Sequence, residues 1–222
     1  MRIWIFSLAA LLLASPASAQ VITRLPTHDK VIALTFDACE SKTPAFYDKA
    51  IGDYLQAEKI PFTIFVTGRF ARHNQEVLKS LAADDLVEIE NHSLDHDNHM
   101  DRMPDAEIRR QIDENGKLLF EITGRKTRFF RFPAGNYDER GLKIAEELGL
   151  RVVHWSFASG DPAKDVTPDR LRSWVLDRTR PGGILIFHIN GRGWSTAQAL
   201  PAIVAELRRR GYRFTTLQAA LS

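Results

Sequence analysis

The sequence contains a single cysteine, Cys39, among its 222 residues. A chain with one cysteine forms no internal disulfide, so its stability has to come from a hydrophobic core, which a domain of this length can supply. The 30 lysines and arginines nearly balance the 28 aspartates and glutamates, for a formal net charge of +2. This balance does not favour nucleic acid as a partner, because nucleic-acid-binding domains carry a clear basic excess.

Apart from its N-terminus, the sequence has no long hydrophobic run. The N-terminus has a basic Arg2, an apolar run over residues 3–14, and Ala-Ser-Ala at residues 17–19, which fits a signal-peptide cleavage site. The run is too short for an ordinary transmembrane helix. We therefore predict a signal peptide at residues 1–19 and one domain at residues 20–222, secreted or periplasmic and without stable membrane insertion. An uncleaved membrane anchor is the alternative.

Short apolar strands alternate with helical patterns along the rest of the chain. The predicted strands cover residues 31–36, 62–66, 86–90, 128–132, 152–155, 184–187 and 212–215. The predicted helices cover residues 44–58, 75–83, 105–121, 139–148, 168–178 and 197–209. This alternation predicts an α/β fold with a parallel sheet. Seven strands are compatible with a distorted (β/α) barrel, and an open doubly wound sheet is the alternative.

Polar side chains that can act in catalysis or bind a metal lie at the C-terminal ends of the predicted strands, where both architectures bind their ligands. Asp37 follows the first strand and His92 the third. Arg131 lies near the end of the fourth strand, and Asp161 lies in the loop after the fifth. His188 follows the sixth strand. Since random placement would scatter such residues, the pattern predicts one site at this edge of the sheet.

His92 and His96 are four residues apart in the segment NHSLDH. On a helical turn this spacing puts both rings on one face, within reach of one metal ion. Neutral imidazole is a natural zinc ligand. Two structural or surface histidines share the same spacing, so the pair alone is weak evidence for a metal site.

The other candidates also have both a functional and a structural interpretation. Arg131 can hold a carboxylate through two hydrogen bonds, or it can form a surface ion pair. His188 ends an apolar strand and is either a reactive residue at the mouth of the site or a hydrogen-bonded core histidine. Asp161 precedes Pro162, where an aspartate also serves as a turn former.

Taken together, the segments TFDA, HSLDH, RFPAG, residues 155–161 and ILIFH are more specific than any one of them. In order and spacing they resemble the motifs of the polysaccharide deacetylases, the NodB-like domains of carbohydrate esterase family 4. The resemblance covers residues 30–215. It implies a distorted seven-stranded (β/α) barrel and metal-dependent removal of N- or O-acetyl groups from sugars.

The resemblance also implies roles for the candidate residues. Asp37 matches the catalytic base, and Arg131 matches the arginine that orients it. His188 matches the general acid, and Asp161 is the only nearby candidate for its acidic partner. The sequence departs from the family at Ala158, which stands where the segment after the fifth strand usually has its first acid.

His92 and His96 match the two metal-binding histidines, so the resemblance implies a divalent metal, with zinc first and cobalt or nickel as alternatives. Family members commonly carry a second aspartate after the base as third ligand, and here Ala38 has no donor atom. Glu40, Cys39 and water are the candidate replacements. We interpret Cys39 first as a small buried hydrophobe.

The sequence therefore predicts an exported, metal-dependent hydrolase that removes acetyl groups from N-acetylated or O-acetylated polysaccharide, such as peptidoglycan or chitin-like oligomers. Trp155 and Ile186 are expected to line a pocket for the acetyl methyl group, and the Ala134 N–H to stabilise the oxyanion. Pro162 stands where the family usually has a tryptophan in this wall. A non-catalytic glycan-binding protein and a cyclic-amide hydrolase on the same fold are the alternatives.

Overall fold

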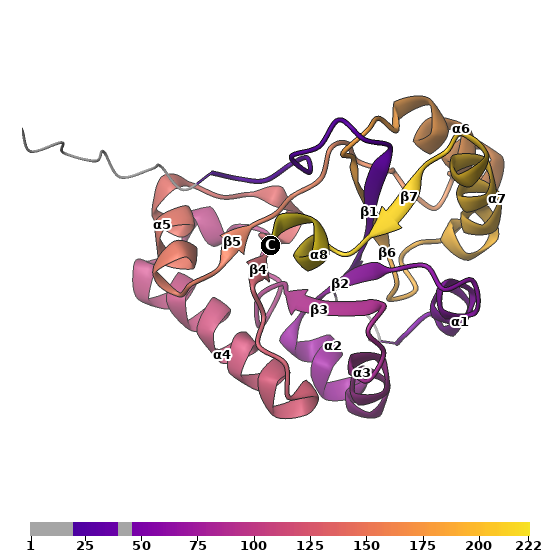
Figure 1. Cartoon of the computed structure of the whole chain (residues 1–222). Helices are drawn as coiled ribbons and strands as arrows, with labels where there is room; N and C mark the ends of the chain where they lie inside the picture. The colour runs from indigo at the N-terminus through magenta and orange to yellow at the C-terminus, as the bar shows by residue number, and fades with distance from the viewer. Residues whose placement is uncertain (1–19, 40–45) are drawn as a thin grey trace, which may run out of the picture.

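The computed structural model describes residues 20–39 and 46–222, and the predicted signal peptide at residues 1–19 lies outside them. In the described ranges, seven strands form one curled sheet with helices packed against its outer side (Figure 1). The strands are β1 (Val31–Ala38), β2 (Phe62–Val66), β3 (Val87–Asn91), β4 (Phe129–Phe130), β5 (Arg151–Val152), β6 (Ile184–His188) and β7 (Arg213–Thr215).

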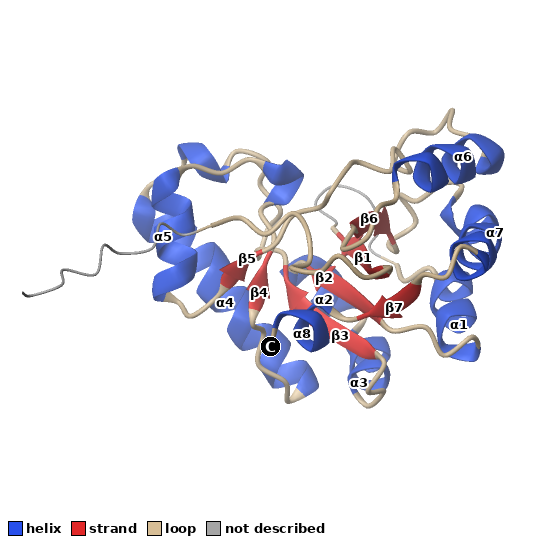
Figure 2. Cartoon of the chain, turned by 45° about the horizontal axis from the view of Figure 1, so that its top comes forward, coloured by secondary structure: helices blue, strands red, loops and turns tan. Residues whose placement is uncertain are grey.

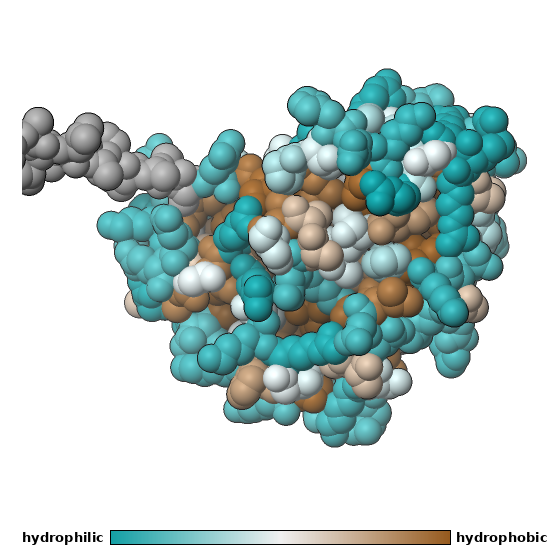
Figure 3. All heavy atoms as spheres, in the orientation of Figure 1, coloured by the Kyte–Doolittle hydropathy of each residue, from teal (hydrophilic) through white to brown (hydrophobic). Residues whose placement is uncertain are grey.

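The helices vary widely in length around this sheet (Figure 2). They are α1 (Lys49–Ala57), α2 (Gly68–His73), α3 (Gln75–Ala82), α4 (Asp105–Thr123), α5 (Glu139–Glu147), α6 (Pro168–Arg178), α7 (Thr196–Arg209) and α8 (Leu217–Leu221). Within the described ranges, none is both long and apolar enough to cross a membrane. The face seen in Figure 3 carries hydrophilic side chains around its edge with apolar ones exposed between them, an ordinary mixture that marks no binding surface by itself.

The strands run in the order β5-β4-β3-β2-β1-β6, and β7 pairs with the first residues of β1. All pairings are parallel, so the C-terminal strand ends lie at one edge. The chain after β5 reaches across to β6, where Phe157 bridges Leu185 and the Ser156 N–H donates to the Ile184 carbonyl at 2.9 Å. The sheet therefore curls into a distorted barrel, and the predicted seven-stranded (β/α) barrel is confirmed.

Alternation along β1 divides the core into an outer and an inner part. The outward side chains join a large apolar cluster with residues of α1, α3 and α7; they are Ile32, Leu34, Phe36 and Ala38. The alternate residues point into the barrel, where Ala33 packs with Phe65 and Val153. Because Asp37 belongs to this inner set, its carboxylate enters the barrel at the C-terminal edge.

The N-terminal end of the barrel is closed by α8 (Figures 1 and 2). Glu88 on β3 accepts hydrogen bonds from the first two backbone N–H groups of α8, at 2.8 and 2.9 Å. Beside it, Glu90 accepts two backbone N–H groups at the start of β4, at 2.8 and 2.7 Å. Burial and the neighbouring Glu88 carboxylate raise the pKa of Glu90 well above its ordinary value of 4.5.

The element boundaries differ from the sequence-based expectations in a few places. The predicted helix at residues 44–58 begins at Lys49, because the Asp48 N–H donates to the Ile189 carbonyl instead of continuing a helix; residues 44–45 lie outside the described ranges. The strands predicted at 128–132 and 152–155 are only two residues long. Helices α2 and α8 are too short to leave a clear periodic pattern.

Candidate active site

A pocket of about 270 Å³ opens at the C-terminal edge of the barrel. It brings together predicted site residues from distant parts of the chain; those that line it are Asp37, His96, Asp161 and His188. Trp155, Ile186 and Ala134 also line it, where the sequence places the acetyl-methyl pocket and the oxyanion donor. Ala134 has a positive φ of 54°. The pocket therefore has both the titratable groups and the apolar wall that the resemblance requires.

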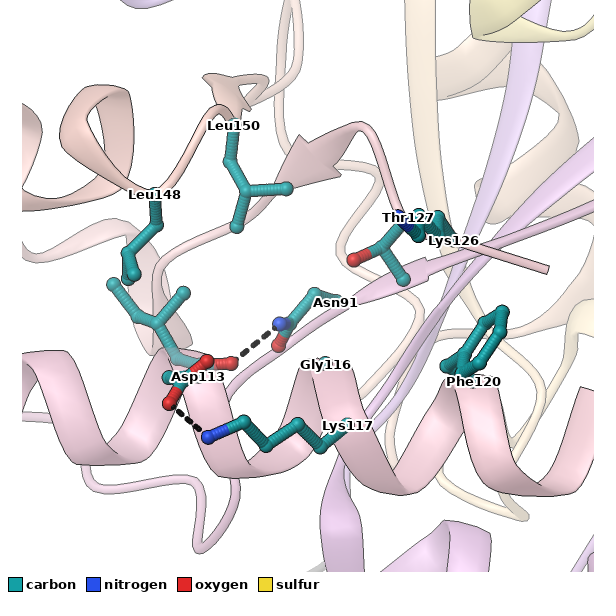
Figure 4. Close-up of a pocket in the computed structure, with 10 residues that line it drawn as sticks. Asn91, Asp113, Gly116, Lys117, Phe120, Lys126, Thr127, Leu148 and Leu150 are labelled. Carbon is teal, nitrogen blue, oxygen red and sulfur yellow. Dashed lines mark hydrogen bonds and ion pairs between the residues drawn. The ribbon is translucent and has the colours of Figure 1, made fainter. Parts of the chain in front are cut away.

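A second hollow of about 260 Å³ lies between α4 and the chain around β4 (Figure 4). Its wall contains the Lys117–Asp113 ion pair on α4 and the apolar side chains of Leu148 and Leu150. Asn91 reaches it and donates a hydrogen bond to a carbonyl of α4. None of the predicted catalytic or metal-binding residues lines this hollow, so the chemistry belongs to the pocket at the strand ends.

Asp37 and Arg131 form a fully buried ion pair at the base of that pocket. Arg131 Nη1 donates to Asp37 Oδ1 at 2.6 Å. Arg131 Nη2 donates to Thr35 Oγ1 at 2.9 Å and to the His154 carbonyl at 3.0 Å, and Nε donates to the Val153 carbonyl at 3.2 Å. With its guanidinium held by several acceptors, Arg131 fixes the orientation of the Asp37 carboxylate. The interpretation of Arg131 as a surface residue is wrong.

The charge state of Asp37 follows from these neighbours. Burial by itself would raise the pKa of Asp37, but the Arg131 guanidinium, together with His188, outweighs burial, and the pKa lies below its ordinary value of 3.8. Burial lowers the pKa of Arg131, while Asp37 raises it, and an arginine stays cationic at neutral pH. Asp37 is therefore a carboxylate at neutral pH, as a general base must be.

His92 lies directly after β3 and is 1% exposed. Its Nδ1 lies 2.8 Å from the Arg131 carbonyl oxygen, which assigns the proton to Nδ1 in the neutral ring and leaves the Nε2 lone pair free. Among the residues that the structure describes, His92 Nε2 has no hydrogen-bond partner, and it lies 3.5 Å from Asp37 Oδ2. A histidine that donates to a backbone carbonyl through one nitrogen and points the other at an open site is typical of a metal ligand.

The expected helical turn between His92 and His96 is wrong. Residues 92–96 form an irregular loop in which Ser93 and His96 have positive φ angles of 69° and 54°. Gln111 on α4 holds this loop, since it accepts from the Asp95 N–H at 2.9 Å and donates to the Asp95 carboxylate at 2.7 Å. The loop brings the two imidazole rings to a centroid distance of 5.0 Å, so the pair is brought together by a route other than the predicted one.

His188 and Asp161 make the contact that the resemblance implied. His188 Nδ1 lies 2.9 Å from Asp161 Oδ1, and the His188 backbone N–H donates to Asp161 Oδ2 at 2.7 Å. Thr196 donates to the same carboxylate at 2.8 Å, and Ser159 donates to it at 3.0 Å. Asp161 is thus held by several donors, although Ala158 stands in place of the family's first acid. It lies in the turn before Pro162, as the structural interpretation expected, and it also pairs with His188.

These contacts decide the charge of His188. Burial would lower the pKa of His188, but the Asp161 carboxylate and its hydrogen bond, with a further contribution from Cys39, raise the pKa well above 6.5. The imidazolium is therefore the favoured form at neutral pH. A protonated His188 at the pocket wall can donate a proton to a leaving group, as a general acid must.

Cys39 is buried, as expected of a small hydrophobe, but its surroundings are polar. One potential ligand atom from each of Cys39, His92 and His96 lies within 4.8 Å of the others, a set that fits a divalent ion such as zinc. Arg192 Nη1 lies 3.7 Å from the sulfur. Burial would raise the pKa of the Cys39 thiol, yet His188, His92 and His96 bring it well below its ordinary value of 9.0. Glu40, another candidate ligand, lies outside the described residues.

Some residues of the site left no signal in the sequence. Thr35 lies inside the apolar strand β1 and accepts from Arg131, while Thr196 begins α7 and holds Asp161. Threonine is common both in strands and at helix starts, so neither position is unusual by residue type. Arg192 reaches the pocket from the loop after β6. Only the three-dimensional arrangement identifies these residues as part of the site.

Comparison with known proteins agrees with this arrangement. The family model for polysaccharide deacetylase matches residues 24–153. The chain belongs to the polysaccharide deacetylase family. It is 30% identical over 204 residues to a peptidoglycan-N-acetylglucosamine deacetylase of Bacillus cereus, covering 90% of this chain and 92% of the relative. It is also 31% identical over 211 residues to a chitooligosaccharide deacetylase of Azorhizobium caulinodans, covering 87% of this chain and 96% of that protein.

Solved structures of the family include both active and inactive members. A peptidoglycan N-acetylglucosamine deacetylase superposes with a TM-score of 0.82 at 28% identity, covering 90% of this chain and 92% of the other. A family 4 pseudoenzyme from Bacillus anthracis superposes equally well, with a TM-score of 0.82 at 26% identity over 93% of this chain and 70% of the other. Its family membership indicates that the protein is a hydrolase. The side chains in its pocket favour an active member of the family over a pseudoenzyme.

Proposed function

We propose that this polysaccharide deacetylase is an exported, metal-dependent enzyme that removes the acetyl group from N-acetylated glycans such as peptidoglycan or chitin-like oligomers. One observation carries the proposal. Asp37, paired with the buried Arg131, lines one pocket together with the His188–Asp161 pair and His96, and the His92 ring lies beside His96. A protein that only holds sugar has no need of an oriented carboxylate base together with a protonated histidine.

The first step requires a base that can take a proton from water. Asp37 is a carboxylate at neutral pH, and Arg131 occupies Oδ1 with a hydrogen bond of 2.6 Å. This leaves Oδ2, which lies 3.5 Å from His92 Nε2, to accept the water proton as the water oxygen attacks the acetyl carbon. Arg131 keeps the carboxylate in one orientation during this transfer.

Metal at this site would be held by His92 and His96, with zinc as first choice and cobalt or nickel as alternatives. When bound, a divalent ion polarises the acetyl carbonyl and lowers the pKa of the attacking water. Within residues 20–39 and 46–222, Nε2 of His92 has no hydrogen-bond partner, which supports this assignment because a buried ring nitrogen without a hydrogen bond is costly unless a ligand occupies it.

The second step requires an acid that protonates the departing amine. His188 holds a proton at neutral pH because Asp161 stabilises the imidazolium. Donation of this proton to the amine completes the cleavage and releases acetate and the free amino sugar. Trp155 and Ile186 provide an apolar wall for the acetyl methyl group.

Release of acetate from a panel of acetylated glycans tests the proposal, with chelator and then with added zinc, cobalt or nickel. The matched pair of variants is Asp37→Asn in the pocket and Asp29→Asn on the surface, since Asp29 is exposed. Loss of a general base should lower the rate roughly 10²–10⁴-fold in Asp37→Asn, with no change in the control. A folded Asp37→Asn protein within a few-fold of wild-type activity contradicts the assignment.

The similarity to the pseudoenzymes supports a second candidate, a glycan-binding protein without turnover. This candidate predicts binding of acetylated oligosaccharide with no acetate released under any metal condition. Export is tested separately: the secreted or periplasmic protein should begin at Gln20, and its N-terminal sequencing after expression with the full leader checks this.

A further inference from the structure

Ala38 stands where the family commonly has an aspartate as third metal ligand, and alanine has no atom that can bind a metal. Ala38 is fully buried and belongs to the apolar cluster between the sheet and the helices. Its carbonyl accepts from Thr67 Oγ1 at 3.2 Å, so the strand end is fixed in this orientation. Since side chains alternate along β1, Ala38 points away from the interior that receives Asp37. A carboxylate at residue 38 would therefore enter an apolar cluster in this backbone.

The next residue is the first that returns to the pocket. Cys39 lines the pocket, and its sulfur lies within 4.8 Å of the ligand nitrogens of His92 and His96. Tetrahedral zinc with bonds of about 2.3 Å to sulfur and about 2.0–2.1 Å to nitrogen separates its ligand atoms by roughly 3.3–3.7 Å. The three atoms therefore need to approach one another by only about 1 Å to hold an ion.

A second, independent observation points to a missing ligand at this place. His92 is 1% exposed, and its Nε2 has no hydrogen-bond partner among the described residues. Its Nδ1 is held by the Arg131 carbonyl at 2.8 Å, so the ring cannot turn to satisfy the other nitrogen. A buried, fixed and unpartnered lone pair beside a thiol and a second imidazole is what a metal site requires.

Two residues of the loop after β6 hold Cys39 in place. The Asn190 side chain donates to the Cys39 carbonyl, and its amide nitrogen lies 3.9 Å from the sulfur. Arg192 Nη1 lies 3.7 Å from the sulfur. Both are donors, which favour a negatively charged sulfur.

We propose that Cys39 is the third protein ligand of the catalytic metal, so that this enzyme carries a Cys–His–His site where its family carries an aspartate. The inference rests on the metal dependence within the proposed function. A set of three protein ligands leaves one position open for water and substrate, as in other catalytic zinc sites. Thiolate and imidazole favour zinc or cobalt over magnesium or manganese.

Cobalt titration tests the ligand set without any assay of turnover. Thiolate bound to cobalt(II) gives a charge-transfer absorption in the near ultraviolet, which histidine and carboxylate ligands do not give. Wild type should show this band, and Cys39→Ser and Cys39→Asp should lack it. Loss of a group that only supports a ligand costs roughly 10–100-fold in affinity, so Cys39→Ser should bind zinc at least about 100-fold more weakly.

Matched variants separate the two possible positions of the third ligand. Cys39→Asp should retain zinc better than Cys39→Ser, whereas Ala38→Asp in the Cys39→Ser background should not restore it. His28→Ala changes an exposed histidine and controls for surface metal binding. Because Cys39 is the only cysteine, alkylation of the native protein reports on it alone, and zinc should protect it.

The outcomes are distinguishable. A wild-type band together with zinc protection supports the inference even if no glycan releases acetate, in which case the proposed function fails and the metal site stands. Absence of the band with zinc still bound, or zinc affinity within about two-fold of wild type in Cys39→Ser, overturns the inference. Alkylation at the same rate with and without bound zinc also overturns it, and would make Cys39 a free thiol.

Discussion

Replacement of Arg131 by methionine is the sharpest test of how this site is built. Arg131 is fully buried, and its guanidinium donates to the Asp37 carboxylate, to Thr35 and to two backbone carbonyls. Methionine has a similar length and keeps the packing but supplies none of these donors. The change therefore leaves a buried carboxylate without its cation and buried acceptors without a partner.

The expected loss of stability follows from the ion pair and hydrogen bonds that Arg131 makes. Removal of one partner of a buried ion pair costs roughly 3–5 kcal/mol, because the other charge remains uncompensated. Since small domains have unfolding free energies of about 5–15 kcal/mol, the variant should be strongly destabilised but can still fold. Arg131→Lys restores the charge without the planar fork, so it should recover part of the loss.

The loss of unfolding free energy in Arg131→Met should depend on pH, because the substitution changes the pKa of Asp37. In the wild type the pKa of Asp37 is depressed, so its stabilising contribution is present above the unfolded pKa and is lost as pH falls through the folded pKa. In Arg131→Met, burial is no longer opposed by the guanidinium, and the pKa of Asp37 rises. The deficit in unfolding free energy should therefore be largest near neutral pH and shrink as pH falls toward 4.

Urea unfolding across this pH range measures the deficit, and the acid limb of kcat/KM reports the same carboxyl group. The limb should move to higher pH in Arg131→Met. Arg125→Met is the control, because Arg125 contacts an exposed Asp85 carboxylate at 3.4 Å and should change stability little. The reasoning is refuted if Arg131→Met loses less than about 1 kcal/mol at neutral pH, the range of a surface ion pair.

The remaining predictions concern the other titratable groups. Asp161→Asn removes the carboxylate that raises the pKa of His188, so the basic limb of the rate profile should move to lower pH; an unchanged limb refutes the pairing. His188→Ala should lower the rate roughly 10²–10⁴-fold and remove that limb. Glu90→Gln should stabilise the protein at neutral and alkaline pH, because the raised pKa of Glu90 costs stability as pH rises above its unfolded value. Urea unfolding from pH 4 to 9 checks this, and equal pH profiles for Glu90→Gln and wild type contradict it.

The fold could be predicted well from the sequence because most strands and helices of the barrel have clear local patterns of apolar residues. The apolar runs of β1, β2 and β6 are buried on both faces, so they stand out as continuous strands. The strands β4 and β5 are only two residues long, and their partners rather than their own patterns define them. The N-terminal closure by α8 depends on Glu88, whose position in a strand gives no hint of a helix cap.

The site was predictable to the extent that its residues follow strands. Asp37, Arg131 and His188 come from strand ends, and parallel strands bring such ends to one edge. The route from His92 to His96 was not predictable, because a four-residue spacing is shared by a helical turn and by this loop. The positive φ angles at Ser93 and His96 that distinguish the two depend on contacts with α4.

The proposed third metal ligand, Cys39, lies one residue beyond Ala38, the position at which the family commonly has an aspartate. By the family motif, the missing ligand belongs at residue 38, and a carboxylate there is the obvious replacement. In the barrel, residue 38 faces the helices with Ile32, Leu34 and Phe36, and its side chain is part of the apolar cluster. The proposed third ligand, Cys39, stands one residue later, on the inner side that it shares with Asp37, and its sulfur lies within 4.8 Å of the ligand nitrogens of His92 and His96. If Cys39 is the third ligand, the ligand set differs from the family's by one residue along the chain, while both histidines stay in place.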